Sequence, residues 1–346
     1  MADYRCLLCG DPQQPSEYMY RAASHLEDRG VAFERMDWQA TLSASAFRDL
    51  TMDMEAYGPA AYDTTAIEER LDGIDFLVVH KAPVSASVLG AGSDLAVVGA
   101  ARGGVENVAV DAAAERGVTV VHAPGRNANA VADYAIALAL AALREIPRFV
   151  ETTARGEWAL EFDPAGLPRD VTNLTVGIVG FGNVGRRVAE RWAGFGPDLL
   201  AYDPYVDEEI IRSRGATPVT LPELLETADV LTLHVRLSDE TEHLIGDEEL
   251  ALLDEDALLV NTARGGLVDT DALVAALERE AIGGAALDVF EEEPLPADHP
   301  LCGCERVWLT PHTAGSTRDA VTNGALIVAA DLAAIIADEE PAHRLA

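Results

Sequence analysis

The chain has 346 residues, a length that suggests two domains with ample core, and it carries a formal net charge of −34. Acidity this strong excludes general binding to nucleic-acid backbones, because the chain has no basic face that could displace counterions from phosphates. The acids are spread along the whole chain rather than gathered in a tail, which argues against disorder.

Residues 1–125 alternate between apolar strands and helical stretches. Strands are predicted near residues 4–9, 76–79, 95–98 and 119–121. Cys6 and Cys9 have C-x-x-C spacing, but they lie inside the first apolar run, which favours a buried strand over a redox motif. A zinc site would need this pair to meet Cys302 and Cys304 in tetrahedral geometry, so we expect no metal.

A turn signal at residues 123–127 is followed by an apolar helix over 128–143, and then by a polar loop over 156–170 that contains Pro164 and Pro168. Two stretches, 134–143 and 324–337, are apolar enough to suggest membrane spans, but both are shorter than the roughly 18 residues that a span needs. Residues 1–5 also lack the basic region and apolar core of a signal peptide. We therefore expect a soluble, cytoplasmic protein with no membrane partner.

A glycine motif follows, between two strands. An apolar run over 175–179 leads into Gly180, Gly182 and Gly185, and an amphipathic helix comes next. Gly180 allows the tight turn, Gly182 lets a pyrophosphate approach the backbone, and Gly185 lets the helix pack closely on the sheet. Asn183 and Val184 offer their N–H groups to the anion at the positive end of the helix. The motif predicts a dinucleotide site.

The strand after this helix ends at Asp203. An acid at this point is placed to accept hydrogen bonds from an adenosine ribose. Its charge would repel a 2′-phosphate, and the next residues, Pro204 and Tyr205, supply no arginine to hold one. NAD is therefore favoured over NADP.

Further strands are predicted near residues 199–202, 230–233, 257–261, 285–287 and 307–309, with helices such as 269–280 between them. This alternation is typical of a doubly wound parallel sheet. The last helix, 316–337, follows the sheet and is expected to return to the first domain. We therefore predict an α/β fold of two doubly wound parallel-sheet domains. A Rossmann NAD domain, residues 126–314, is inserted into a flavodoxin-like substrate domain, residues 1–125 and 315–346.

Three segments at predicted strand ends carry chemically useful side chains. Residues 261–266 read N-T-A-R-G-G, residues 287–294 read L-D-V-F-E-E-E-P, and residues 310–317 read T-P-H-T-A-G-S-T. The glycine motif and these three segments follow one another in the order found in the D-2-hydroxyacid dehydrogenase family, which includes phosphoglycerate dehydrogenases. The chain therefore resembles this family. The resemblance covers nearly the whole length.

The resemblance implies that His312 is the general acid, that Glu293 is its partner, and that Arg264 binds the substrate carboxylate. A carboxylate beside an imidazole stabilises the protonated ring, and a planar guanidinium suits a planar carboxylate. Glu291 and Glu292 are expected to be solvated. The resemblance also assigns further residues to the NAD site, with Asp288 near the nicotinamide: Val235, Thr241, Thr262, Asp288, His312 and Gly315.

In the first domain, the resemblance points to a glycine-rich turn at residues 99–107 whose amides hold the substrate carboxylate. Arg102 precedes Gly103 and Gly104 where phosphoglycerate dehydrogenases more often carry a glycine. We therefore expect a second anionic or hydroxylated group on the substrate. Lys81 follows the strand at 76–79 and is the chain's only lysine, and we expect it to bind substrate as well.

The main hypothesis is an enzyme that interconverts a 2-keto acid and its D-2-hydroxy acid with NAD. The alternative is an NAD(H)-sensing interaction protein, like the corepressors that share this fold. Formate dehydrogenases pair the histidine with an amide, so Glu293 argues against them. Family resemblance and the apolar helix at 128–143 suggest a homodimer. The acid stays open among 3-phosphoglycerate, hydroxypyruvate, glyoxylate and sugar-derived keto acids.

The basic residues other than Lys81 are all arginine, and Asp and Glu together number 59. This composition suggests an extreme halophile, in whose cytoplasm a Debye length of about 3 Å would screen the net charge. We predict that the midpoint of thermal unfolding rises as KCl is raised into the molar range. Maximal stability in dilute buffer would contradict halophilic adaptation.

Overall fold

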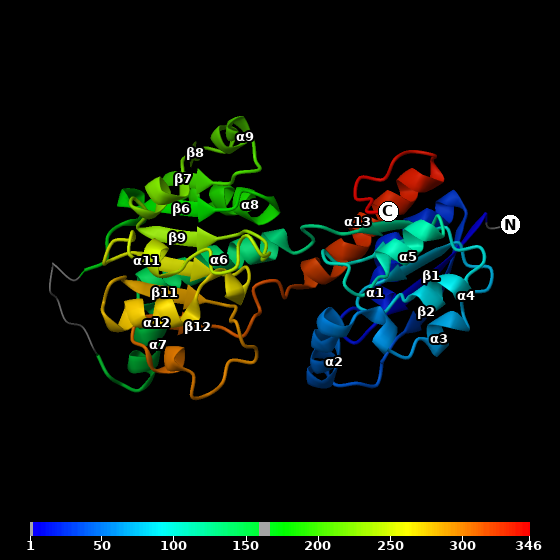
Figure 1. The fold of residues 1–346 in the computed structure, drawn as a ribbon, viewed down its shortest axis with the longest axis horizontal. Coiled ribbons are helices and arrows are strands. Elements are labelled where there is room, and N and C mark those ends of the chain that lie inside the picture. Colours follow the sequence, from blue (N-terminus) through cyan, green and yellow to red (C-terminus); the bar gives the residue numbers. More distant parts are fainter. Residues whose placement is uncertain (1–2, 159–166) are drawn as a thin grey trace. The chain divides into compact units, whose positions relative to one another are not determined.

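The computed structural model describes residues 3–158 and 167–346, so the predicted helix interruption at Pro164 lies outside the described residues. The chain divides into two compact units, each an α/β sandwich (Figure 1). Unit 1 comprises Met1–Asn127 and Ser316–Ala346, and unit 2 comprises Ala128–Gly315. The two units are described separately below.

Unit 1 contains a five-stranded parallel sheet in the order β2-β1-β3-β4-β5, which is the flavodoxin-like order that the sequence predicts. Its strands are β1 (Tyr4–Gly10), β2 (Val31–Asp37), β3 (Phe76–Val79), β4 (Val97–Ala100) and β5 (Thr119–His122). The sequence did not predict β2, because this edge strand is half-exposed and its polar residues interrupt any apolar run.

Strand β4 begins two residues later than predicted and ends at Gly99 and Ala100, which contribute little apolar signal. A Cβ atom at Gly99 would lie 2.4 Å from Val328 Cγ1, so the absence of a side chain lets helix α13 (Arg318–Ile336) pack directly on this strand. The other helices of the unit are α1 (Ser16–Ala23), α2 (Ala44–Tyr57), α3 (Thr65–Glu68), α4 (Ala86–Ala91) and α5 (Val110–Glu115).

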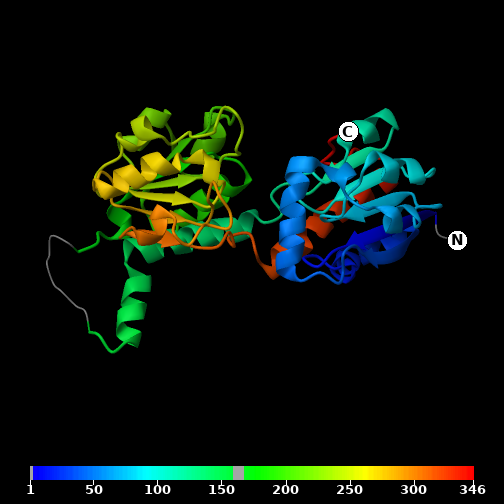
Figure 2. The same cartoon turned by 60° about the horizontal axis from the view of Figure 1, so that its bottom comes forward.

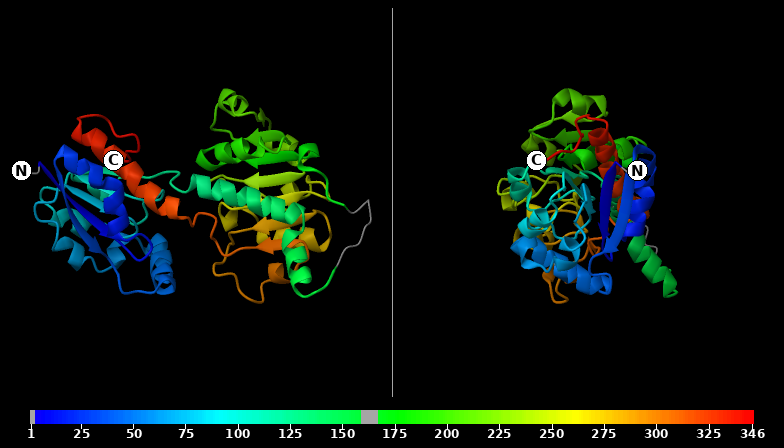
Figure 3. Two further views of the ribbon diagram at one scale, coloured as in Figure 1. Left: turned by 180° about the vertical axis from the view of Figure 1, so that it is seen from behind. Right: turned by 90° about the vertical axis from the view of Figure 1, so that its right-hand side faces the viewer.

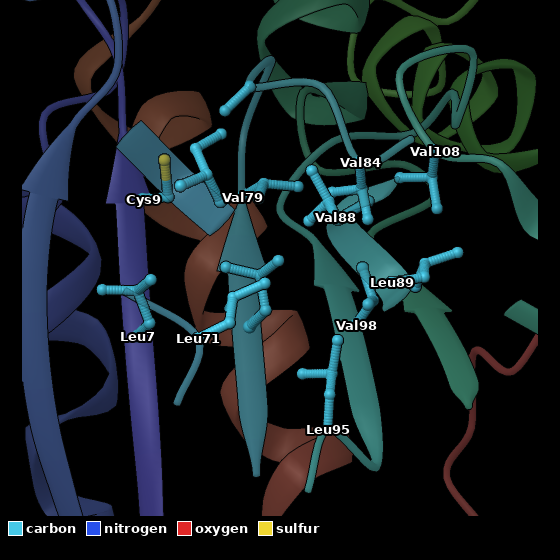
Figure 4. Packing of buried hydrophobic residues seen from close by; sticks show 14 of the residues in the cluster. Leu7, Cys9, Leu71, Val79, Val84, Val88, Leu89, Leu95, Val98 and Val108 are labelled. Carbon is cyan, nitrogen blue, oxygen red and sulfur yellow. The ribbon is translucent and has the colours of Figure 1, made fainter. Parts of the chain in front are cut away.

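The sheet of unit 1 buries apolar side chains on both faces. Leu7, Cys9, Val79 and Val98 point into the cluster covered by α2 to α5 (Figure 4). Cys6, on the opposite face of β1, belongs to the cluster under α1 and α13. Cys6 and Cys9 are therefore core residues of a buried strand, as predicted, and burial raises the pKa of both thiols.

Helix α13 has a length and an apolar composition that would also suit a membrane span. It packs on α1, β4 and β5 (Figure 3). Its residues Val328 and Leu332 belong to the buried cluster on this face of the sheet. Its buried Asp331 accepts hydrogen bonds from the Ala342 amide and from His343 Nδ1, at 2.9 and 3.0 Å. Packing within unit 1 buries one face of this helix, whereas Leu326 on the helix is exposed.

Unit 2 contains a seven-stranded parallel sheet in the order β12-β11-β10-β9-β6-β7-β8, a doubly wound arrangement. Its strands are β6 (Thr175–Val179), β7 (Asp198–Tyr202), β8 (Thr217–Pro218), β9 (Val230–Leu233), β10 (Leu258–Asn261), β11 (Gly284–Leu287) and β12 (Val307–Leu309). All but the two-residue β8 were predicted within one residue of these bounds. The predicted class of two parallel-sheet α/β domains is confirmed.

The helices of unit 2 are α6 (Ala128–Leu143), α7 (Ile146–Ala154), α8 (Asn183–Trp192), α9 (Glu208–Ser213), α10 (Leu221–Leu225), α11 (Asp247–Leu250) and α12 (Thr270–Glu278). Helix α6 lies across the sheet and packs on α8, β10 and β11 (Figure 3). Its apolar residues are used inside the unit, so they are not by themselves a sign of a dimer. Helix α7 was not predicted, and it projects from the unit (Figure 2). None of its side chains is buried.

Candidate active site

The glycine loop joins β6 to α8 at the carboxyl edge of the unit 2 sheet. Gly180 has φ +91°, and a Cβ atom there would lie 2.7 Å from the carbonyl carbon of His234. At Gly185 a Cβ atom would lie 2.0 Å from the Gly180 oxygen, so only glycine allows this approach. A Cβ atom at Gly182 would meet nothing within 4 Å, which leaves room for a phosphate group beside the backbone.

Helix α8 begins at Asn183, so the amides of Asn183 and Val184 belong to its first turn. Asp203 follows β7 and lies beside the glycine loop, because its Oδ2 accepts a hydrogen bond of 2.7 Å from the Phe181 amide. Its Oδ1 accepts a hydrogen bond of 2.9 Å from the Tyr205 amide. These two contacts hold the carboxylate at the end of its strand.

The other predicted cofactor residues lie on loops that follow neighbouring strands. Val235 comes two residues after β9, and its Cγ1 would be 2.7 Å from a Cβ atom at Gly180. The hydroxyl of Thr241 bonds within its own loop, to the Arg236 carbonyl at 2.6 Å. Thr262 follows β10, and Gly315 is the last residue of unit 2.

Two buried polar atoms at this edge lack a partner among the described residues: Thr262 Oγ1 and His234 Nδ1. His234 donates or accepts through Nε2 at 2.9 Å from the Thr232 hydroxyl, and burial lowers the pKa of its ring to about 3. A neutral imidazole and a hydroxyl are groups that a nucleotide could satisfy. Together with the open space at Gly182, they make this edge fit a dinucleotide.

His312 and Glu293 form the shortest contact of the candidate catalytic residues. His312 Nδ1 lies 2.6 Å from Glu293 Oε2, and Glu293 Oε1 accepts a hydrogen bond of 3.1 Å from the Phe290 amide. The imidazole is about half exposed, and the carboxylate is more buried. Burial favours the neutral carboxyl of Glu293, but these hydrogen bonds and the charge of Arg264 outweigh it, so the pKa of Glu293 lies below its usual range.

Arg264 lies on the turn after β10, directly before the short helical turn Gly265–Leu267. This turn packs tightly on the Glu293 segment, since a Cβ atom at Gly265 would lie 1.9 Å from the Phe290 carbonyl carbon. The guanidinium is exposed and donates one hydrogen bond to the Ala263 carbonyl, at 2.7 Å. The structure thus brings Arg264, Glu293 and His312 together.

The sequence left Glu291 as a solvated acid, but the structure gives it a partner. His243 Nε2 lies 2.7 Å from Glu291 Oε1, and the Thr270 amide donates to Glu291 Oε2 at 3.3 Å. The hydrogen bond to Glu291 raises the pKa of His243. Glu291 and Glu292 are both exposed, as predicted, but Glu291 also pairs with a second histidine. His243 is exposed, and it stands 48 residues before Glu291, so the sequence carries no local signal of this pair.

Asp288, which is predicted to lie near the nicotinamide, contacts donors of the chain itself. Its side chain is completely buried, and both carboxylate oxygens accept hydrogen bonds from the segment 310–314 that carries His312. Contact between Asp288 and the cofactor stays a prediction.

The predicted substrate residues of unit 1 follow its strands β3 and β4. The Lys81 amide donates to the buried Asp11 at 2.9 Å, and its ammonium donates to the Thr51 hydroxyl at 3.2 Å. Arg102 is largely buried and lies 3.1 Å from Glu106. Gly103 follows on an exposed turn whose carbonyl lies 2.8 Å from His122 Nδ1, and Gly104 comes next.

Sequence reasoning missed Arg126, which follows β5 at the same edge of the unit 1 sheet. Its guanidinium donates to the Ala320 carbonyl at 2.9 Å, and burial, together with the charge of Arg102, lowers its pKa. The signal in the sequence was its place in the turn after a predicted strand. Three cations, Lys81, Arg102 and Arg126, thus follow three adjacent strands of an acidic chain.

Comparisons with known proteins agree with this geometry. Residues 136–314, just over half of the chain, match the NAD binding domain of D-isomer specific 2-hydroxyacid dehydrogenase. The chain is 40% identical over 273 residues to D-3-phosphoglycerate dehydrogenase of Methanocaldococcus jannaschii, covering 78% of this chain and 51% of that protein. It is 40% identical over 277 residues to glyoxylate reductase of Korarchaeum cryptofilum, covering 80% and 83%.

The chain therefore spans about half the length of the phosphoglycerate dehydrogenases that it matches. Among solved structures, D-lactate dehydrogenase with NAD+ from Lactobacillus jensenii aligns with a TM-score of 0.78 and 25% identity, over 99% of both chains. The glycine loop, the family match and this NAD-bound neighbour agree on NAD as the cofactor. The chain belongs to the D-isomer specific 2-hydroxyacid dehydrogenase family.

Proposed function

We propose that this protein is an NAD-dependent dehydrogenase that interconverts a 2-keto acid and its D-2-hydroxy acid. The observation that carries the proposal is the 2.6 Å contact between His312 Nδ1 and Glu293 Oε2, with the Arg264 charge acting on the same carboxylate. When bound, NAD(H) supplies or takes up the hydride. The residues of the chain then have to bind the acid and move one proton.

His312 is the group that moves the proton. An ionised carboxylate only accepts hydrogen bonds, so Glu293 orients the ring with the proton on Nδ1 and stabilises the imidazolium. Nε2 is then the atom that donates a proton to the 2-keto oxygen, and it takes the proton back from the hydroxyl in the reverse direction. Arg264 binds the substrate carboxylate, where its planar guanidinium can form two parallel hydrogen bonds.

The experiment that tests this function follows the NADH absorbance band with a panel of 2-keto acids at high KCl. Oxidation of NADH that requires one of these acids supports the dehydrogenase. Tight NADH binding with no oxidation by any acid would instead favour the NAD(H)-sensing alternative. The same panel with NADPH tests the preference that Asp203 implies.

The charge on Glu293 contributes to the stability of the fold. Because the pKa of Glu293 is lowered in the folded state, its ionised form stabilises the fold at pH values above the unfolded pKa of about 4.3. This contribution is lost as the pH falls through the folded pKa.

The same charge should set the pH dependence of the reaction rate. We predict that E293Q lowers kcat about 10- to 100-fold, because an amide stabilises the protonated imidazole less than a carboxylate does. The fall in reduction rate with rising pH should begin at a lower pH than in the wild type. E292Q, a change at the exposed neighbour, is the control, and an identical pH profile for E293Q would refute the pairing.

For the substrate we propose an acid with a second anionic group. This group would be held by Lys81 and Arg102, and the amides of Gly103 and Gly104 would hold its carboxylate. Support comes from the cations that follow β3, β4 and β5. Burial and the charge of Arg102 lower the pKa of the Arg126 guanidinium, and a bound anion would oppose both effects.

We predict that K81A raises KM about tenfold for such an acid, which is the effect of losing roughly 1.5 kcal/mol of charge-assisted hydrogen bonding. Glyoxylate, which has no second anionic group, should be affected much less, and K81R should restore most of the affinity. R116A removes an exposed cation from the same unit and serves as the matched control. A KM for K81A that is unchanged with every acid would exclude Lys81 from the substrate site.

For the assembly we propose a homodimer, and α7 is the surface that supports it. Ile146, Phe149 and Val150 on this amphipathic helix are 48%, 41% and 63% exposed. Such a group of exposed apolar side chains is typical of an interface. We predict that F149E/V150E shifts the wild-type dimer to monomer in light scattering after gel filtration, whereas Y57E, at an exposed aromatic of unit 1, does not. A monomeric wild type would disprove the dimer.

A further inference from the structure

We propose that Asp288 is a positioning residue, whose buried carboxylate holds the segment that carries His312 in the conformation that pairs it with Glu293. The proposal rests on the proposed function of His312 as the acid/base. It differs from the expected contact between Asp288 and the nicotinamide, because the groups that Asp288 touches belong to the chain itself.

The carboxylate of Asp288 is surrounded by donors from the segment 310–314. Oδ1 accepts hydrogen bonds from the Thr310 hydroxyl at 2.7 Å and from the Thr313 amide at 3.0 Å. Oδ2 accepts a hydrogen bond from the Ala314 amide at 2.8 Å. The side chain has no exposed surface, so these three donors replace water around a buried anion.

These donors lie on both sides of His312. Thr310 precedes it by two residues, and Thr313 and Ala314 follow it directly. Asp288 is itself anchored, because its amide donates to the Asn261 carbonyl at 2.9 Å and it follows β11, which pairs with β12. Thr310 is anchored to the same strand, since its amide donates to the Leu287 carbonyl at 2.9 Å. The segment is therefore tied to the rigid sheet at both of its ends.

The hydrogen bonds to Asp288 hold the backbone of His312 in an unusual conformation. Its φ is +48°, in the left-handed region that residues with a side chain rarely adopt. Its amide donates to the Thr310 carbonyl at 3.0 Å, which closes a tight turn around the residue. Such a conformation persists only where the surroundings determine it, and the hydrogen bonds to Asp288 on either side do so. Released from them, His312 would relax and its ring would leave Glu293.

The decisive variant is D288N. An amide offers only one oxygen, and its NH₂ group must face either the Ala314 amide or the donors on the other side, so at least one of the three hydrogen bonds becomes a clash of donors. We expect kcat with the best 2-keto acid to fall about 100-fold, as for a catalytic group displaced by an ångström. The Kd for NADH, measured by fluorescence, should change less than about threefold.

A second readout needs no substrate. In ¹⁵N-histidine spectra, with the His312 signals assigned through H312Q, the wild type should show the proton on Nδ1 that the pairing with Glu293 requires. D288N should show the mixed tautomers of a free imidazole. Wild-type protein that reduces no 2-keto acid would overturn the proposed function, whereas this spectrum would still decide the role of Asp288.

Changes at Thr310 provide a graded test in case D288N does not fold. T310V removes one donor and should lower kcat about tenfold, while T310S keeps the hydroxyl and should restore it. D298N makes the same chemical change at an exposed acid of unit 2 and is the matched control. The proposal is overturned if D288N, or T310V in its place, keeps the wild-type His312 signals and kcat. It is also overturned if NADH binding weakens more than about tenfold while kcat at saturating NADH is unchanged.

Discussion

The candidate site depends on one constraint, which is that the strands of unit 2 run parallel and in register. Parallel strands end at the same edge, so the residues directly after β6, β7, β10, β11 and β12 become neighbours although they are far apart in the sequence. Gly180, Asp203, Arg264 and Asp288 all owe their place to this edge. The loops after the strands carry the candidate site residues, and the sheet holds these loops in fixed positions.

Three acids that follow β11, namely Asp288, Glu291 and Glu293, have different contacts although each carries the same chemical group. Glu293 pairs with His312, Glu291 pairs with His243, and Asp288 is buried among donors of the segment 310–314. Glu291 and Glu293 are two residues apart, and both have a lowered pKa for similar reasons. The two acids differ in the histidine that each one contacts, which is His243 for Glu291 and His312 for Glu293.

Unit 1 presents a different electrostatic problem. In a chain with a net charge of −34, the turns after β3, β4 and β5 each carry a cation. Asp11 lies under them, fully buried, where burial opposes ionisation but His80 and the amides of Lys81 and Gln14 outweigh it and lower its pKa. The Asn107 amide also donates to the His80 and Ala82 carbonyls, at 3.3 and 2.8 Å, so the backbone on both sides of Lys81 is held in place.

The sequence by itself determined the elements whose signals are local. Apolar runs predicted nearly every buried strand, the glycine spacing predicted the turn into α8, and the motif order pointed to Arg264, Glu293 and His312. Only the tertiary structure decided the rest, because it depends on partners distant in the chain. The half-exposed edge strand β2 is ordered by pairing with β1, and the structure places the short helix α7 outside the core of its unit. In the sequence, Asp288 is one acid among several that follow a predicted strand. Its hydrogen bonds reach 22 to 26 residues along the chain, so they leave no periodic pattern, and only the fold shows that residues 310–314 surround it.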